Sequence, residues 1–162
     1  MTSQTGAMAL AQINTDTSLV TTEDIPWAEL MPGVELKFLR VGGPSGTYTI
    51  ITRFAPGIEL PKHWHFGEVH AHTISGRWGY REYGWLAEAG SYAYEPVGSI
   101  HTLFTPEDNS EQTVVLFVID KGMALLDEND QPFHIEDAHG LYKLYLDALE
   151  AAGIPAPPGV LP

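Results

Sequence analysis

Short stretches of alternating hydrophobic and polar residues run through most of this chain, separated by turns rich in glycine and proline. Alternation with a period of two is typical of strands that bury one face. The sequence predicts strands at residues 34–41, 47–54, 58–65, 70–74, 77–83, 91–94, 101–104, 113–119, 123–126 and 132–135. Many short strands joined by such turns favour an all-β sandwich or barrel.

The pattern changes near His139, where apolar residues begin to recur at intervals of three and four. This spacing is typical of an amphipathic helix, and Gly153 and a proline-rich tail end it. The apolar stripe consists of Leu141, Leu144, Tyr145, Ala148 and Leu149. We therefore expect three parts: an N-terminal arm at 1–25, a β-barrel at 26–138, and a C-terminal helix with its tail at 139–162.

Composition narrows the functional classes. A chain of 162 residues with 44% hydrophobic content can bury a core without covalent staples. The absence of cysteine excludes disulfides, thiolate metal sites and cysteine nucleophiles. A net charge of −13 disfavours binding to nucleic acids and to anionic membrane surfaces. No apolar run approaches the roughly 20 residues that span a membrane, so we expect a cytoplasmic protein.

Three histidines follow a pattern that suits a metal. His63 and His65 flank a tryptophan in a predicted strand, so their side chains point to the same face. His101 would supply a third imidazole from a distant strand. Three such ligands form a facial set, which leaves coordination positions open for a substrate or oxygen.

The spacing around these histidines resembles the two sequence motifs of the cupin superfamily. The matching residues are Gly57, His63, His65 and Gly76 in the first motif, and Gly90, Pro96, Gly98 and His101 in the second. The final asparagine of the second motif is replaced here by Thr105. The resemblance implies a single-domain cupin, a double-stranded β-helix or jelly-roll barrel.

One departure concerns a glutamate that usually serves as the fourth ligand in cupins. Counting back from the end of the first motif places Val69 there, and valine cannot bind a metal. Glu68, His70 and His72 lie nearby, but a regular strand would turn them to the opposite face. If Trp78 faces inward, alternation brings Tyr80 and Glu82 to the same face. Glu82 is therefore our first choice as fourth ligand, with His70, His72 or water as alternatives.

Residues 75–83, 89–92 and 94–96 are similar to small cupins that cleave carbon–carbon bonds with O2, namely 2,4'-dihydroxyacetophenone dioxygenase and, less closely, acetylacetone dioxygenase. The first resemblance implies Fe(II) held by the three histidines and a carboxylate at Glu82. The second implies that three histidines alone bind the iron. In that case Glu95 would not bind the metal but would act in catalysis next to its ligands. The same nitrogen ligands also suit Zn, Ni or Mn, which a purified sample could carry instead.

The chemistry fits an iron-dependent dioxygenase. Three neutral imidazoles leave the charge of a divalent ion uncompensated, and a β-diketone or aromatic α-hydroxyketone can lose a proton and chelate as an enolate. Trp78 and Tyr80 are expected to wall an apolar pocket for this small ketone, which reacts with O2. The alternatives are a zinc-binding sensor of the ChrR type, or an isomerase or hydrolase on the same scaffold. ChrR-type regulators carry a helical domain ahead of the cupin, and only about 25 unpatterned residues precede it here.

Apolar residues in the arm and helix also predict assembly into a homodimer or homotetramer. We expect one barrel to leave them partly uncovered, and a two-fold interface would bury them. These residues are Ile13, Leu19 and Val20 in the arm and Leu141, Leu144 and Leu149 in the helix.

Overall fold

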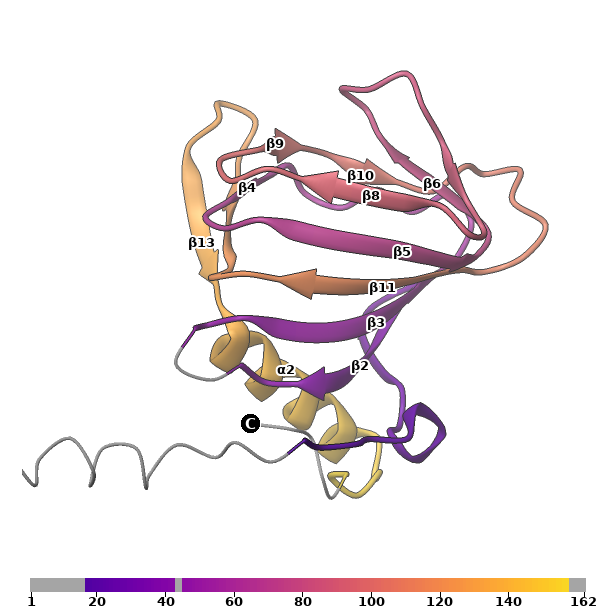
Figure 1. Ribbon diagram of the computed structural model, residues 1–162, viewed down its shortest axis with the longest axis vertical. Coiled ribbons are helices and arrows are strands. Elements are labelled where there is room, and N and C mark those ends of the chain that lie inside the picture. Colours follow the sequence, from indigo (N-terminus) through magenta and orange to yellow (C-terminus); the bar gives the residue numbers. More distant parts are fainter. Residues whose placement is uncertain (1–16, 43–44, 158–162) are drawn as a thin grey trace, which may run out of the picture.

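Antiparallel strands dominate residues 17–42 and 45–157, which are the residues that the computed structural model describes (Figure 1). The strands are β1 (Ala28–Met31), β2 (Val34–Arg40), β3 (Tyr48–Phe54), β4 (His63–His65), β5 (Val69–Ser75), β6 (Arg77–Tyr80), β7 (Ala87–Glu88), β8 (Tyr92–Glu95), β9 (Ile100–His101), β10 (Leu103–Phe104), β11 (Thr113–Ile119), β12 (Met123–Leu126) and β13 (Pro132–Glu136). A 3-10 turn, η1 (Thr22–Asp24), precedes them, and helix α2 (Ala138–Ala151) follows. The prediction of an all-β fold with a C-terminal helix is confirmed.

A six-stranded sheet forms the larger wall of the barrel, in the order β1-β2-β3-β11-β5-β8. The other strands form a four-stranded sheet, β13-β12-β4-β9, and a three-stranded sheet, β10-β6-β7. In β11 buried and half-buried residues alternate along the whole strand. Its residues Val115, Phe117 and Ile119 are buried in the core. In β11 the period-two pattern of the sequence therefore sets which face fills the barrel.

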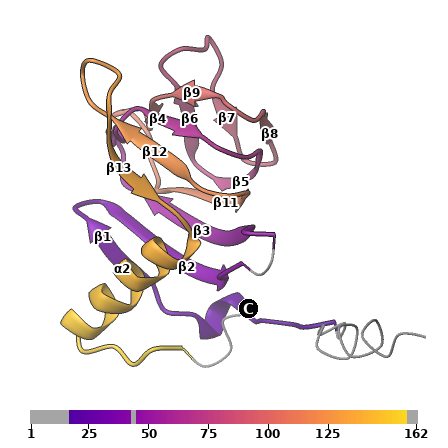
Figure 2. The ribbon, with the colours of Figure 1, turned by 90° about the vertical axis from the view of Figure 1, so that its left-hand side faces the viewer.

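Helix α2 packs against the same barrel, alongside β1 and β2 (Figure 2). The Asp137 side chain caps it by accepting a hydrogen bond from the Gly140 N–H at 2.8 Å. Leu141 and Leu149 are buried against the chain's own core, whereas Leu144 is about half exposed. The expectation that one barrel leaves these residues partly uncovered is therefore wrong for Leu141 and Leu149. No helix in the described ranges is long and apolar enough to cross a membrane.

The described part of the N-terminal arm also contacts the barrel. Val20 packs against the core, and Ile25 is buried within it. The Lys37 ammonium donates a hydrogen bond to the Thr22 carbonyl at 2.9 Å, which holds η1 over β2. Ile13 lies outside the described residues, so the idea that the arm crosses to a partner stays a prediction.

Candidate metal centre

Three buried histidines meet on the inner face of the four-stranded sheet. His63 and His65 belong to β4, and Trp64 between them points outward and is 40% exposed. His101 belongs to β9, where the antiparallel register sets it directly opposite His63. One nitrogen from each ring lies within 4.8 Å of the other two. The strand alternation and the pairing of β4 with β9 together bring about the convergence that the sequence predicts.

His63 is held in the form that a metal ligand requires. Its Nδ1 lies 3.0 Å from the Pro61 carbonyl oxygen, to which a protonated Nδ1 can donate. That hydrogen bond leaves the lone pair of Nε2 free. Burial, with the nearby His65 ring, lowers the pKa of His63 to about 4. The ring is therefore neutral near pH 7.

Glu95 faces the other two histidines directly. Its Oε2 lies 3.1 Å from Nε2 of His65 and 3.3 Å from Nε2 of His101. The Tyr80 hydroxyl donates a hydrogen bond to Oε1. Burial alone would raise the pKa of the Glu95 carboxyl, but His101 and His65 outweigh it and hold that pKa well below the ordinary range. Glu95 is thus a buried carboxylate among three buried imidazoles.

The unsatisfied atoms of this cluster fit a bound cation. Oε2 of Glu95 is close to Nε2 of His65 and of His101, but these contacts lack hydrogen-bond geometry. Both ring nitrogens of His65 and His101, and Oε2 of Glu95, are thus buried without a hydrogen-bond partner among the described residues. Orphaned buried polar atoms are costly, and a metal ion would satisfy those that face it. Two ligand atoms that are each about 2.1 Å from one ion, at right angles to each other, are about 3 Å apart. The observed nitrogen–oxygen separations of 3.1 and 3.3 Å are close to this value. His63, His65, His101 and Glu95 could therefore hold one divalent ion.

The position of Glu95 also explains the departure at Val69. In the antiparallel pairing of β5 with β8, Glu95 stands directly opposite Val69. The carboxylate thus comes from the neighbouring strand to the same part of the barrel wall. Only the register between the two strands reveals this, because nothing in the residue spacing specifies which position of β8 pairs with Val69.

The structure does not bring Glu82 to the histidines. Strand β6 ends at Tyr80, so the alternation that predicted an inward Glu82 stops two residues too early. Both carboxylate oxygens of Glu82 instead accept hydrogen bonds from Thr102, from its backbone N–H at 2.8 Å and its hydroxyl at 3.0 Å. The expected ligand role of Glu82 does not agree with this placement.

The other proposed alternatives lie on the outer face of β5 or, for Glu68, just before it. Glu68 contacts His70 at 3.2 Å, and His70 also lies within hydrogen-bond distance of the Tyr92 hydroxyl. His72 is exposed on the same face. These side chains point away from the three buried histidines, as the strand alternation indicates.

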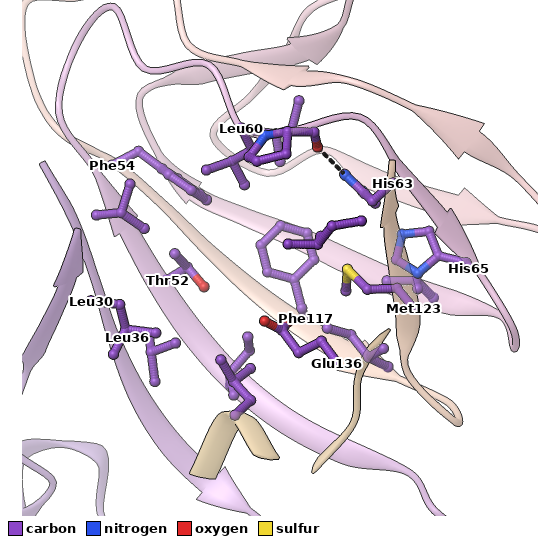
Figure 3. A pocket seen from close by; sticks show the side chains of 18 of the residues that line it. Leu30, Leu36, Thr52, Phe54, Leu60, His63, His65, Phe117, Met123 and Glu136 are labelled. Carbon is purple, nitrogen blue, oxygen red and sulfur yellow. Dashed lines mark hydrogen bonds between the residues drawn. The ribbon is translucent and has the colours of Figure 1, made fainter. Parts of the chain in front are cut away.

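An apolar cavity of about 270 Å³ opens beside the cluster (Figure 3). His63, His65, Tyr80 and Glu95 form part of its wall, and the rest is mainly aliphatic and aromatic. The Tyr80 ring also stacks on the ring of His101, with centroids 3.6 Å apart and planes 14° apart. Trp78 is not among the lining residues. It is fully buried, and its indole N–H donates to Thr73 Oγ1 at 2.8 Å. Of the two expected pocket residues, the structure places only Tyr80 at the cavity.

Comparison with known proteins identifies the family. The family model described as the ChrR cupin-like domain matches residues 15–124. The chain belongs to this cupin family. A search of curated proteins found no match.

Several solved structures share this cupin fold. A protein of unknown function with a cupin-like fold from Ralstonia eutropha JMP134 is 33% identical, with 87% of this chain and 91% of that chain covered and a TM-score of 0.78. An acetylacetone dioxygenase from Acinetobacter johnsonii is 16% identical, covering 85% and 95% of the two chains, with a TM-score of 0.70. The anti-sigma factor ChrR, solved with SigE from Rhodobacter sphaeroides, is 19% identical, covering 74% and 67%, with a TM-score of 0.52. The last two show likeness of fold alone.

Proposed function

We propose that this cupin is a mononuclear non-haem Fe(II)-dependent dioxygenase that cleaves a carbon–carbon bond in a small β-diketone or aromatic α-hydroxyketone. The observation that carries the proposal is the cluster of three buried imidazoles and one buried carboxylate, of which His63, His65 and Glu95 line an apolar cavity. A cavity of about 270 Å³ suits a small substrate, since drug-sized ligands occupy roughly 300–1,000 Å³.

Each residue of the centre has a distinct task. His63, His65 and His101 would hold the ion with neutral nitrogens, and Glu95 would neutralise part of its charge. The Tyr80 hydroxyl fixes the orientation of Glu95 by donating to its Oε1, and burial raises the pKa of Tyr80 well above its ordinary value, so the donor keeps its proton. When bound, iron supplies a Lewis acid for the enolate and a redox centre for O2.

The apolar wall of the cavity would bind the substrate and exclude water. Leu60, Leu103 and Phe117 are apolar residues of that wall, and they exclude water from the side of the cluster that faces the cavity. Such a wall favours the hydrocarbon part of a ketone and leaves its oxygens to the ion. The fold of the acetylacetone dioxygenase supports this proposal only at the level of architecture, because the identity is 16%.

A metal-binding regulator without catalysis is the second candidate. The family model is that of the ChrR cupin-like domain, and one solved relative is an anti-sigma factor. A regulator needs the metal but neither a ketone nor oxygen uptake. Turnover therefore separates the two candidates.

The decisive experiment is anaerobic reconstitution with Fe(II), followed by oxygen-electrode measurements with a series of β-diketones and hydroxyacetophenones. We expect O2 uptake that matches the cleavage products in amount. The His65→Ala variant and the zinc-loaded protein serve as inactive controls. Cleavage without O2 uptake would favour a hydrolase, and tight zinc binding without turnover of any ketone would favour the regulator.

A further inference from the structure

One of the two carboxylates that line the cavity takes no part in the metal centre. Glu136, the last residue of β13, points into the cavity beside Met123 and Phe117 (Figure 3). Its carboxylate is half-buried, and the charges of His134 and Asp137 act on it. A half-buried carboxylate in an apolar cavity is costly to keep, so its presence calls for a function.

The strand register sets Glu136 at a defined distance from the histidines. His65 pairs with Met123, and Met123 pairs with Glu136, so the three residues form one row across β4, β12 and β13. Neighbouring strands lie about 4.8 Å apart, which separates the backbones of His65 and Glu136 by about 10 Å. His65 and Glu136 both line the cavity. A ligand anchored at the metal centre can therefore reach Glu136 through an apolar body about one ring long.

The electrostatics of this remote end favour one kind of ligand group. Burial raises the pKa of the Glu136 carboxyl, and the negative charge of Asp137 adds to the rise, while His134 opposes it. No lysine or arginine is among the described residues that line the cavity. Tyr48 belongs to the same wall, and burial, with the charges of Glu136 and Asp137, raises its pKa, so its hydroxyl stays protonated. This end of the cavity offers a carboxyl group and a buried phenol hydroxyl, but no cation to receive an anion.

We propose that Glu136 determines specificity at the end of the ligand remote from the histidines. It accepts a hydrogen bond from a hydroxyl or amino group there, and it excludes ligands that carry a carboxylate or another anion at that position. The inference deepens the proposed function, on which it rests for the chelating end of the ligand.

The test uses the zinc-loaded full-length protein, in which binding occurs without turnover. The probes are 1-phenylbutane-1,3-diones that carry hydroxyl, amino, methyl or carboxylate groups at the ring position opposite the diketone, and calorimetry gives their Kd values. We expect the hydroxyl and amino probes to bind about tenfold or more tightly than the methyl probe, because hydrogen bonds to charged groups are strong. We expect the carboxylate probe to bind at least about tenfold more weakly than the methyl probe.

Two variants and one control isolate the role of Glu136. Glu136→Gln should keep part of the preference for the hydroxyl probe and lose most of the discrimination against the carboxylate probe. Glu136→Leu should make the methyl probe the tightest ligand. Glu128→Gln, on the exposed turn between β12 and β13, should behave like the parent protein.

Three results would overturn the inference: equal binding of hydroxyl and methyl probes to the parent, an unchanged ranking in Glu136→Leu, or no binding of any probe to the zinc-loaded protein. The outcome is separable from the proposed function. If the ranking follows the expectation while the iron-loaded protein consumes no O2, the dioxygenase proposal fails and the role of Glu136 stands.

Discussion

Burial separates the histidines of this chain into two groups. His63, His65 and His101 are at most 5% exposed, whereas His72 lies exposed on the outer face of β5. We expect about one divalent first-row metal ion per chain, with occupancy collapsing in His65→Ala because a ligand is lost. His72→Ala is the matched control and should retain the metal. Elemental analysis measures both variants, and full occupancy in His65→Ala would disprove the assigned centre.

The two candidate carboxylates should respond differently to the same substitution. Glu95→Gln removes the charge that faces His65 and His101, so metal affinity should fall by roughly 10–100-fold or more. Glu82→Gln alters the hydrogen bonds with Thr102, which is not one of the four residues of the centre, and should leave metal affinity near that of the parent. Competition with a chromogenic chelator measures both affinities. The reverse order would restore Glu82 as the ligand.

Tyr80 acts on the centre through Glu95 and through its stacking on His101. Tyr80→Phe keeps the ring but removes the hydroxyl that donates to Glu95. Its loss should weaken metal binding or slow turnover within the roughly 10–100-fold range typical of groups that orient ligands. Tyr92→Phe is the control, because Tyr92 is exposed on the outer face. Equal behaviour of the two variants would show that the hydroxyl of Tyr80 has no positioning role.

At the scale of elements, helix α2 is part of the barrel's own core. Leu149 is 1% exposed and Leu144 is 47% exposed, although both belong to the stripe that the sequence predicts. Leu149→Ala should cost about 2–5 kcal/mol of unfolding free energy, the range for truncating a buried leucine. Leu144→Ala should cost much less. Urea denaturation of both variants checks this, and equal costs would mean that α2 packs differently.

At the scale of the whole molecule, we expect a two-fold symmetric homo-oligomer. Tyr92 and Tyr94 on β8 and Ile74 on β5 are about half exposed on neighbouring strands of the larger sheet, and exposed apolar surface of this kind favours association. Light scattering at micromolar concentration should give at least twice the chain mass. A monomeric mass would rule out the oligomer.

The N-terminal segment allows a separate test of its part in assembly. Residues 20–25 contact the barrel of their own chain, so the deletion should remove only residues 1–16. If the arm crosses to a partner, the shortened chain should dissociate at higher concentrations than the full chain does. An unchanged dissociation constant would exclude the arm while leaving the oligomer itself intact.

The sequence by itself determined the wall of the barrel and the three histidines. Alternation is a local property with a period of two, so it assigns faces within a strand without knowledge of its neighbours. The glycines of the two motifs could also be assigned to turns from the sequence. Gly76, for example, has a φ of +70°, and a Cβ there would lie 2.5 Å from Thr113 Oγ1. His63 and His65 share a face for the same local reason.

The sequence offered Glu82 and Glu95 as candidate carboxylates, and tertiary structure decided which of them lies against the histidines. Glu95 reaches the histidines because β8 pairs with β5 in a register that no local spacing reveals. Glu82 stays outside because β6 ends at Tyr80, and strand ends depend on how neighbouring chain segments pair. Glu136 shares one row with His65 because the β12–β13 hairpin joins the sheet through the pairing of β12 with the distant strand β4. Pairing between strands distant in sequence is a non-local choice, made by the packing of the whole barrel.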